Sequence, residues 1–294
     1  MAKRVPKYSY TGESRVSADN NYWYIHLLSG GVFSFKRGKA SFDAFLVGGG
    51  AGGNGSSSIY GGAGGTGGKT ATVKKLSAGA GETFNIVVGL GGAGGAANGF
   101  ASPGGATSAF GQSVAGGTVD TSDFISNSAN GIGGSGGGVG AYGNLKWAPG
   151  KGGEDGADGS SGGGTWLASK GQGTTTRAFG ESTGDLYASG GGGGGYQSSS
   201  YTVAGAAGGT GAGSGGSASK GGDASPNTGS GGGGGGRGNS SAVYAGGNGA
   251  DGIVILRGAE NDALPVYFDG VELEEIVFNG VSLDSLVYNG TEVF

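Results

Sequence analysis

The sequence predicts a mainly β protein with a strand-rich base, a bundle of short polyglycine-II-type helices and a C-terminal repeat of short strands. Three observations lead to this prediction. Of the 294 residues, 80 are glycine, against about 7% in ordinary proteins. Glycine recurs at every third position within several islands, and strand-like runs flank these islands. Only 13% of residues are charged and 9% are aromatic, which favours an ordered fold over a disordered chain.

The base is expected to come from both ends of the glycine-rich region. Residues 1–47 contain NYWYIHLLSGGVFSFKRGKASFDAFLV, whose aromatic and β-branched runs, broken by SGG and KRGK, predict two or three strands. The strand-like segments 42–47 and 253–256 flank the glycine islands, so we expect them to pair with each other. The segment TATVKKLSAGAGETFNIVV predicts a hairpin at the same end.

The glycine islands have a period of three residues. This period matches the left-handed polyproline-II-type helix, which has no internal hydrogen bonds. Collagen shares the period but needs long proline-rich triplets, whereas this chain has five prolines. We therefore expect short helices whose side-chain-free faces let neighbouring backbones pair N–H with C=O. The two longest runs contain Gly131, Gly134, Gly137, Gly140 and Gly143, and then Gly150, Gly153, Gly156, Gly159 and Gly162.

The C-terminal residues carry a separate repeat of ten residues. Its units are VYFDGVELEEI, VFNGVSLDSL and VYNGTEVF. Each has an Asp-Gly or Asn-Gly dipeptide between apolar residues, which is a strong signal for a hairpin turn. Units this small bury too little surface to be stable alone, so we expect the repeat to pack on another chain or on the main body.

Composition divides the chain into a basic segment at residues 1–20, a glycine-rich domain at residues 21–257 and the repeat at residues 258–294. Residues 1–40 hold seven Lys or Arg and two acids, whereas residues 259–294 hold eight acids and no Lys or Arg. This asymmetry suggests different neighbours for the two ends, although two solvated surfaces explain it equally well. The lack of a basic stripe along the chain argues against a nucleic-acid partner.

Several functional classes lack the residues that they need. With no cysteine, disulfides and thiolate metal sites are excluded. An apolar run long enough for a membrane span is missing, and the N-terminal segment has no apolar core of a secretory signal. We expect no enzyme activity and no cofactor, because His26 is the only histidine and is better explained as a half-buried strand residue than as a general base.

Two other motifs are weak. GTGGKT at residues 65–70 lacks the first glycine of a phosphate loop, whose place is taken by Ala63, and no helix pattern follows it. Calcium could be bound by GGNGADGIV at residues 246–254, or by Glu154, Asp155 and Asp158. The first is a single copy of a repeat that needs tandem copies, and a solvated charged surface explains the second better. We expect no metal site.

The order of motifs resembles the glycine-rich domain common in phage and prophage tail proteins. The resemblance covers about residues 22–257 and rests on SGGVFSF, FDAFLVGGGAGG, GETFNIVVG, GGATSAFG and the closing GADGIVILR. The alternation of glycine islands and variable loops also looks like the tail-fibre adhesins of T-even-like phages, in which loops at one end of a glycine-helix sandwich contact the bacterial surface. Strand-rich ends and the C-terminal repeat depart from that second pattern.

If the islands alternate outward and inward from the base, five short connections lie together at the far end. These are residues 56–60, 96–103, 141–149, 196–204 and 239–245, and the longer connections 69–88, 104–130, 165–189 and 217–228 lie at the base. Exposed aromatic rings offer large contact area and stack on sugars, so we expect receptor binding there, although the same rings would also cap the bundle. The candidate residues are Tyr60, Phe100, Tyr142, Trp147, Tyr196, Tyr201 and Tyr244.

The resemblance implies a phage or prophage-derived tail adhesin that binds a bacterial surface polysaccharide or outer-surface protein. Other virion tail proteins are its expected partners, and the C-terminal repeat suggests a homo-oligomer such as a homotrimer. The protein would be made in the host cytoplasm and act outside the cell as part of the virion tail. The alternative is a structural virion component, such as a baseplate or head-fibre part, that binds no receptor. Ice binding is a third and weaker reading, because the islands are irregular.

Overall fold

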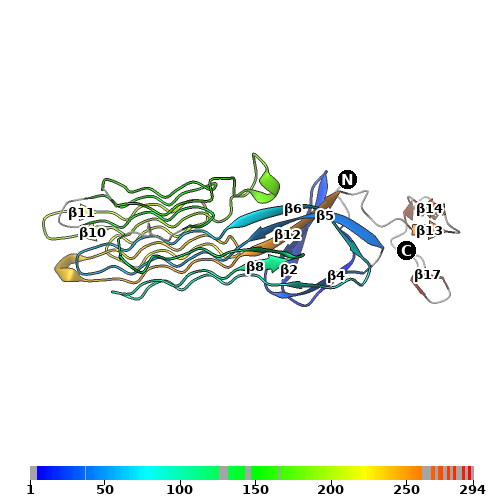
Figure 1. Ribbon diagram of the computed structural model, residues 1–294, viewed down its shortest axis with the longest axis horizontal. Helices are drawn as coiled ribbons and strands as arrows, with labels where there is room; N and C mark the ends of the chain where they lie inside the picture. The colour runs from blue at the N-terminus through cyan, green and yellow to red at the C-terminus, as the bar shows by residue number, and fades with distance from the viewer. Residues whose placement is uncertain are drawn as a thin grey trace.

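The computed structural model shows a mainly β protein. It describes residues 5–36, 38–125, 132–142, 147–164 and 166–259, together with six short strands in the C-terminal repeat. A β base occupies one end of the glycine-rich region, and long glycine segments extend from it in one direction (Figure 1). The first 47 residues form five strands: β1 (Tyr8–Tyr10), β2 (Ser14–Ala18), β3 (Tyr22–Leu27), β4 (Gly31–Phe35) and β5 (Lys39–Val47).

Two antiparallel sheets make up the base. The five-stranded sheet has the order β2-β3-β12-β5-β6, with β6 at Thr70–Gly79 and β12 at Ile253–Ala259, and the three-stranded sheet has the order β1-β4-β7, with β7 at Phe84–Ile86. Every second residue of β3 is buried, and Trp23, Ile25 and Leu27 point into the main core together with Phe33 and Phe35 of β4. The period of two therefore places one face of the larger sheet against the smaller sheet.

The pairing of residues 42–47 with 253–256 is confirmed, because β5 and β12 are antiparallel neighbours with Val47 opposite Ile253. The predicted hairpin over TATVKKLSAGAGETFNIVV is wrong. Its first strand, β6, pairs with β5 in one sheet, and its second strand, β7, pairs with β4 in the other. The turn between β6 and β7 thus crosses from one sheet to the other, which closes the core on that side.

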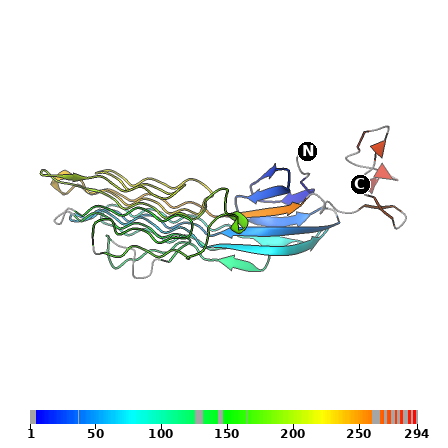
Figure 2. The same ribbon diagram turned by 90° about the horizontal axis from the view of Figure 1, so that it is seen from above.

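The glycine-rich segments run side by side along the long axis of the molecule (Figures 1 and 2). The backbone N–H groups of residues 49–57 donate to three neighbouring segments in turn. Segment 99–105 accepts from Gly49, Gly52 and Gly55, and segment 244–250 accepts from Gly50, Gly53 and Ser56. Segment 60–66 accepts from Ala51, Asn54 and Ser57, and the N···O distances are 2.8 to 3.1 Å. Hydrogen bonds therefore leave residues 49–57 in three directions with a period of three, whereas a strand of a sheet has a period of two.

Segment 48–56 also accepts hydrogen bonds from three further neighbours, at residues 92–98, 117 and 232–235. These neighbours leave no room for a Cβ at the glycine positions, although the side chains of Ala51 and Asn54 are accommodated in the same segment. A Cβ added to Gly53 would lie 2.2 Å from the carbonyl oxygen of Gly233, and one added to Gly52 would lie 2.2 Å from that of Ala93. Segments 190–195 and 229–237 are likewise bonded to six neighbours each. The described residues contain no helix of seven or more residues, so the predicted polyglycine-helix bundle is not confirmed as such.

The path through the bundle has more segments than the sequence predicts. Connection 104–130 contains a hairpin of β8 (Thr107–Ala109) and β9 (Gln112–Val114). Residues 115–125 then run along the bundle, because Ala115 accepts a backbone hydrogen bond from Lys69 and Ile125 accepts one from Gly140. Connections 165–189 and 217–228 also include bundle segments, at residues 166–171 and 217–224. Placing these three connections entirely at the base is therefore wrong.

The island at residues 150–162 is not one helix either. It reverses direction at Asp155 and Gly156, where φ is 51° and 83°, so residues 150–154 and 157–162 run antiparallel. Segments 133–141 and 190–194 nevertheless both run antiparallel to segment 61–68, as their backbone hydrogen bonds to that segment show. The alternation of the later segments is consequently unchanged.

The remaining elements are short. The 3-10 helix η2 (Ala178–Gly180) lies beside the base, whereas β10 (Tyr196–Gln197), β11 (Thr202–Val203) and η3 (Asn239–Ser241) lie in loops of the bundle. The repeat forms three separate antiparallel pairs: β13 (Val266–Phe268) with β14 (Val271–Leu273), β15 (Val277–Phe278) with β16 (Val281–Ser282), and β17 (Val287–Tyr288) with β18 (Thr291–Glu292). Each pair flanks one Asp-Gly or Asn-Gly dipeptide, as the sequence predicts.

Candidate functional site

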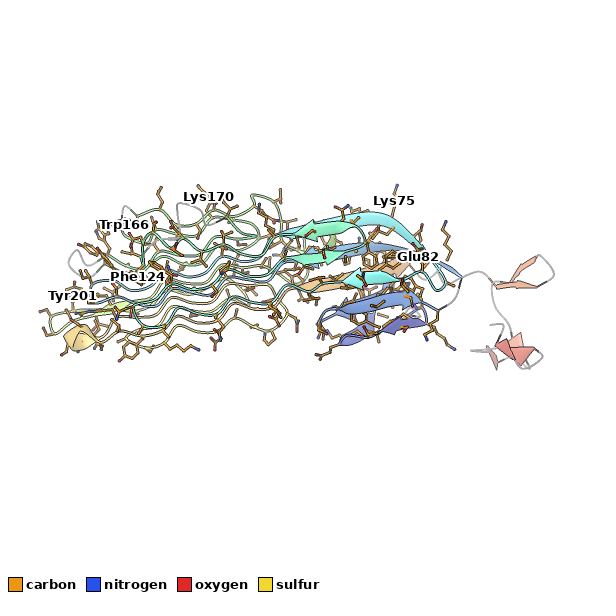
Figure 3. The ribbon with its side chains drawn as sticks, turned by 60° about the horizontal axis from the view of Figure 1, so that its bottom comes forward. Lys75, Glu82, Phe124, Trp166, Lys170 and Tyr201 are labelled. Carbon is orange, nitrogen blue, oxygen red and sulfur yellow. The ribbon has the colours of Figure 1, made fainter. Side chains whose placement is uncertain are left out.

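The loops predicted for the far end of the bundle lie together, at what we call the outer end. Residues of all five loops are linked by backbone contacts: Asn98 donates to Ser56, Ser56 donates to Tyr244, and Arg237 pairs with both Tyr196 and Val243. Tyr60 in turn pairs with Tyr142. Figure 3 shows Tyr201 and Phe124 toward this end and Lys75 and Glu82 at the base. The structure therefore brings the candidate residues together at one end of the bundle.

Tyr60, Tyr142 and Trp147 form one aromatic group. The rings of Tyr60 and Tyr142 stack with centroids 5.0 Å apart, and the ring of Trp147 lies 5.7 Å from that of Tyr142. All three side chains are half-buried. Burial, and then the neighbouring Tyr142, raises the pKa of Tyr60 above its usual value. Edges of this group stay accessible to a ligand.

Phe100 and Tyr244 are the most exposed of the candidate residues, each 36% exposed. One face of Phe100 stacks on Phe124, with centroids 4.4 Å apart and planes 14° apart. The backbone of Tyr244 is held by Ser56, whose hydroxyl accepts from the Tyr244 N–H at 2.8 Å. The Phe100 ring is thus fixed on one face and open on the other, and the Tyr244 backbone is fixed, which limits the entropy that binding would cost.

Tyr196 and Tyr201 are packed more tightly. Their rings stack with centroids 5.7 Å apart, and Tyr196 is only 8% exposed. The guanidinium of Arg237 lies 4.4 Å from the ring centroid of Tyr196, within cation–π range. Tyr196 is therefore enclosed by an aromatic ring and a cation, and it supports the surface more than it forms it.

Arg237 links three loops of the outer end and was not singled out by the sequence. Its guanidinium donates to the carbonyl oxygens of Ser58 at 3.2 Å and Gln197 at 2.6 Å and to the hydroxyl of Ser241 at 3.2 Å. The side chain is 8% exposed. One signal could have found it, since Arg237 is the only charged residue between Asp223 and Asp251. Phe124 was also missed, because no glycine period marks its segment.

The acidic residues considered for calcium are engaged in other contacts. Asp155 accepts from the Thr175 hydroxyl, which with the backbone N–H of Thr176 lowers its pKa. Asp158 pairs with Lys170 at 2.6 Å, and this hydrogen bond likewise lowers its pKa. Within the described ranges, no group of three or more His, Asp or Glu side chains could hold a metal ion.

The Asp carboxylate and an Asn amide of the other calcium motif also accept hydrogen bonds from the backbone. Asp251 accepts from the N–H of Gly91 at 2.6 Å, and Asn248 accepts from that of Gly94 at 2.9 Å. They accept from backbone N–H groups of the adjacent segment 89–95, whose carbonyl oxygens in turn accept from Gly246, Gly249 and Gly252. The spacing of three residues between Asn248 and Asp251 therefore matches the spacing of Gly91 and Gly94, the residues whose N–H groups they accept from.

His26 lies in β3 at the base, far along the chain from any outer loop. Its ring is half-buried, and its Nε2 lies 3.1 Å from the Ser17 hydroxyl. Burial, reinforced by the nearby Arg15, lowers the pKa of His26 to about 4. The imidazole is thus neutral at physiological pH.

The family model described as a glycine-rich domain matches residues 28–259. The chain belongs to this family. The match to the glycine-rich domain family begins directly after β3 and ends at the last residue of β12, so it covers the whole bundle and most of the base but not the C-terminal hairpins. A search of curated protein sequences finds no match to the chain. In the part of the chain that the structure describes, no helix has the length and apolar character of a membrane span.

Proposed function

We propose that this glycine-rich domain protein is a phage or prophage-derived tail adhesin that binds a bacterial surface receptor through its outer end. Its glycine segments act as a rigid bundle of polyglycine-II-type helices. The period of three in the hydrogen bonds of segment 48–56 supports that assignment, because three residues per turn is the repeat of this helix. The motif resemblance to phage tail proteins supports the setting.

The observation that carries the proposal is the convergence of five loops on one end of a stiff scaffold. Recognition commonly resides on loops held by a rigid framework. Phe100 and Tyr244 present exposed rings there, and the Tyr60, Tyr142 and Trp147 group presents ring edges beside hydroxyls. Aromatic faces with nearby hydrogen-bonding groups suit sugar rings or a protein surface, so the receptor is a surface polysaccharide or an outer-surface protein.

Substitutions at the most exposed rings test the proposal directly. Virions carrying Phe100→Ser or Tyr244→Ser should adsorb to host cells at least tenfold more slowly, since each change removes accessible aromatic contact area. Leu90→Ser is the matched control, because Leu90 is 71% exposed on the side of the bundle near the base. Particle assembly should be normal in all three.

Normal adsorption by both outer-end variants in normally assembled particles would refute the adhesin assignment. It would leave the second candidate, a structural virion component whose outer-end rings only shield the bundle from water. The burial of Tyr196 and the mutual stacking of the rings favour that candidate. It predicts a lower melting temperature for the variants without any change in adsorption.

The C-terminal hairpins are proposed to join the chain to copies of itself, as in a homotrimer, or to other tail proteins. Their strands are only two or three residues long, and an isolated two-stranded hairpin is marginally stable in water. A partner surface would supply the burial that they lack.

A further inference from the structure

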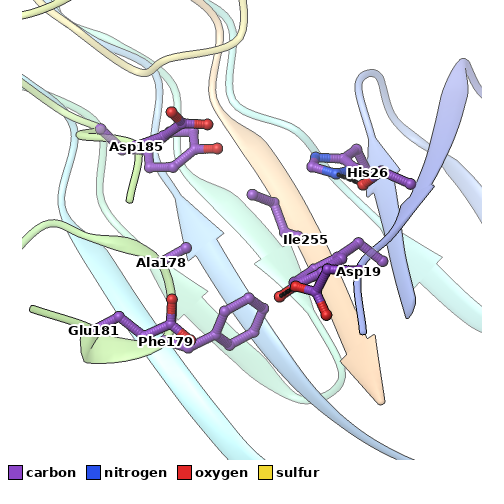
Figure 4. A pocket seen from close by; sticks show the side chains of 10 residues that line it. Asp19, His26, Ala178, Phe179, Glu181, Asp185 and Ile255 are labelled. Atoms are coloured by element: carbon purple, nitrogen blue, oxygen red, sulfur yellow. Dashed lines mark hydrogen bonds between the residues drawn. The ribbon is translucent and has the colours of Figure 1, made fainter. Parts of the chain in front are cut away.

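A pocket of about 240 Å³ lies at the junction of base and bundle, on the face of the five-stranded sheet opposite the main core. Figure 4 shows Ile255 of β12 between the loop residues Ala178 and Asp185 on one side and His26 and Asp19 on the other. The pocket is smaller than drug-sized sites, which start at about 300 Å³. It has room for one small unit of a ligand.

The loop wall of the pocket is held by Arg257 of β12, which is 9% exposed. Its guanidinium binds Glu181 and Asp43 and lies 4.0 Å from the ring centroid of Phe179. Phe179 has φ of 59°, a conformation that costs energy for a residue with a side chain. Its ring is nonetheless buried beside Phe45 and Tyr24. The loop is therefore clamped in one conformation, and the pocket is preformed.

Most polar groups at the pocket already have protein partners. Asp19 accepts from the Tyr24 hydroxyl at 2.9 Å and from two backbone N–H groups, and Glu181 is paired with Arg257. Three groups differ. Among the described residues, no hydrogen bond or ion pair involves the Asp185 carboxylate or the Tyr187 hydroxyl, and the buried Nδ1 of His26 has no hydrogen-bond partner. A buried ring nitrogen without a partner is costly, whereas the Asp185 carboxylate and the Tyr187 hydroxyl remain open to a ligand.

The chemistry of the lining selects the ligand. Tyr24, Phe179 and Tyr187 supply aromatic surface, Ile255 supplies an apolar floor, and Asp185 supplies an acceptor for a hydroxyl donor. The acids Asp19, Asp43, Glu181 and Asp185 outnumber Arg257 and Arg15, the second of which lies close enough to influence both His26 and Tyr187. Because Asp19, Asp43 and Glu181 already have partners, the site disfavours anions and favours an uncharged ligand whose hydroxyl groups donate to Asp185.

We propose that this pocket binds a single sugar unit of a neutral glycan, with the sugar hydroxyls donating to Asp185 and accepting from Tyr187. The site is separate from the outer end and comes from different segments of the chain. It would give the protein a second glycan contact near the base. Its existence does not depend on the adhesin proposal.

Ligand-observed NMR on the full chain tests the site. The probes are the methyl glycosides of glucose, galactose and N-acetylglucosamine, with the protonated methyl glycoside of glucosamine as a charged counterpart. At least one neutral probe should bind with a millimolar dissociation constant. Asp185→Asn and Tyr187→Phe should each weaken it about tenfold, whereas Glu13→Gln, the same kind of charge removal at an exposed residue, should leave it unchanged.

Tyr187→Phe keeps the ring that packs against Phe45, so folding should be preserved, and an unchanged melting temperature would verify this. Absence of binding by every neutral probe would overturn the proposal. So would tighter binding of the glucosamine probe than of its neutral counterparts, since the pocket would then be a cation site. Equal binding by Asp185→Asn, Tyr187→Phe and the unsubstituted protein would place the sugar elsewhere. Virion adsorption through Phe100 and Tyr244 would be unaffected by any of these results.

Discussion

At the scale of single residues, His26 makes the base sensitive to acid. The pKa of the folded form, about 4, lies below the ordinary histidine value of 6.5 because burial disfavours the charged ring. Between these two pH values the unfolded chain binds a proton that the folded chain does not, so stability falls as pH falls from about 6.5 to about 4. The same burial explains why His26 is a poor general base at neutral pH.

His26→Gln should remove this dependence. The free energy of unfolding of the unsubstituted protein should decline relative to that of His26→Gln between pH 6.5 and 4, measured by denaturant titration at several pH values. Because His26 is the only histidine, its imidazole NMR signals also report its pKa without ambiguity. A titration midpoint at or above 6.5 would contradict the burial argument.

Arg237 carries a second prediction at this scale. Arg237→Met keeps the apolar stem but removes the donors to Ser58 and Gln197, and hydrogen bonds to charged groups contribute about 1.5 to 3 kcal/mol. We expect the free energy of unfolding to fall by about 2 kcal/mol. Arg15→Met, at an exposed strand residue, should change it by less than about 0.5 kcal/mol. Equal effects would mean that the Arg237 contacts add nothing.

At the scale of elements, glycine in the bundle is required by the close approach of neighbouring backbones. An added Cβ at Gly53 would meet three backbone atoms between 2.2 and 2.8 Å away. Backbone cannot move aside as a flexible side chain can, because each segment is bonded to several others. Glycine is thus a packing requirement at every position that faces a neighbouring backbone, and segment 190–195 is glycine throughout.

Gly53→Ala should lower the free energy of unfolding by about 3 kcal/mol or more, at or beyond the upper end of overpacking costs. Gly79→Ala is the matched control, since a Cβ there would meet only the Glu82 carboxylate oxygen, 4.0 Å away. Thermal denaturation followed by circular dichroism compares the two. Similar melting temperatures would show that the bundle tolerates side chains and is not closely packed.

At the scale of the whole molecule, the hairpins and the glycine-rich domain have different sources of stability. The domain has its own core and a closed network of backbone hydrogen bonds. The hairpins pair only within each repeat in the described residues. Their role should therefore be separable from the fold of the domain.

Deleting residues 262–294 should convert an oligomer into a monomer, as measured by light scattering after size-exclusion chromatography. The melting temperature of the domain should change by no more than about 2 °C, because a surface change of this kind contributes little to its stability. An unchanged oligomeric state would show that the repeat does not mediate assembly.

Much of the fold follows from the sequence alone, because its signals are local. Alternation in β3, the glycine period and the Asn-Gly dipeptides each act over two to ten residues. They predict strands, close-packed segments and hairpins. The pairing of β5 with β12 was also predictable, since β5 directly precedes the first glycine island and β12 directly follows the last one.

Only the tertiary structure decided which segments are neighbours. Residues 115–125 join the bundle without a glycine period, because a segment at the perimeter needs small residues only on the side that faces its neighbours. The separation of β6 and β7 into two sheets, the three contacts of Arg237 and the pocket beside Asp185 all join residues far apart in the sequence. Such contacts depend on the packing of the whole chain, and no local pattern records them.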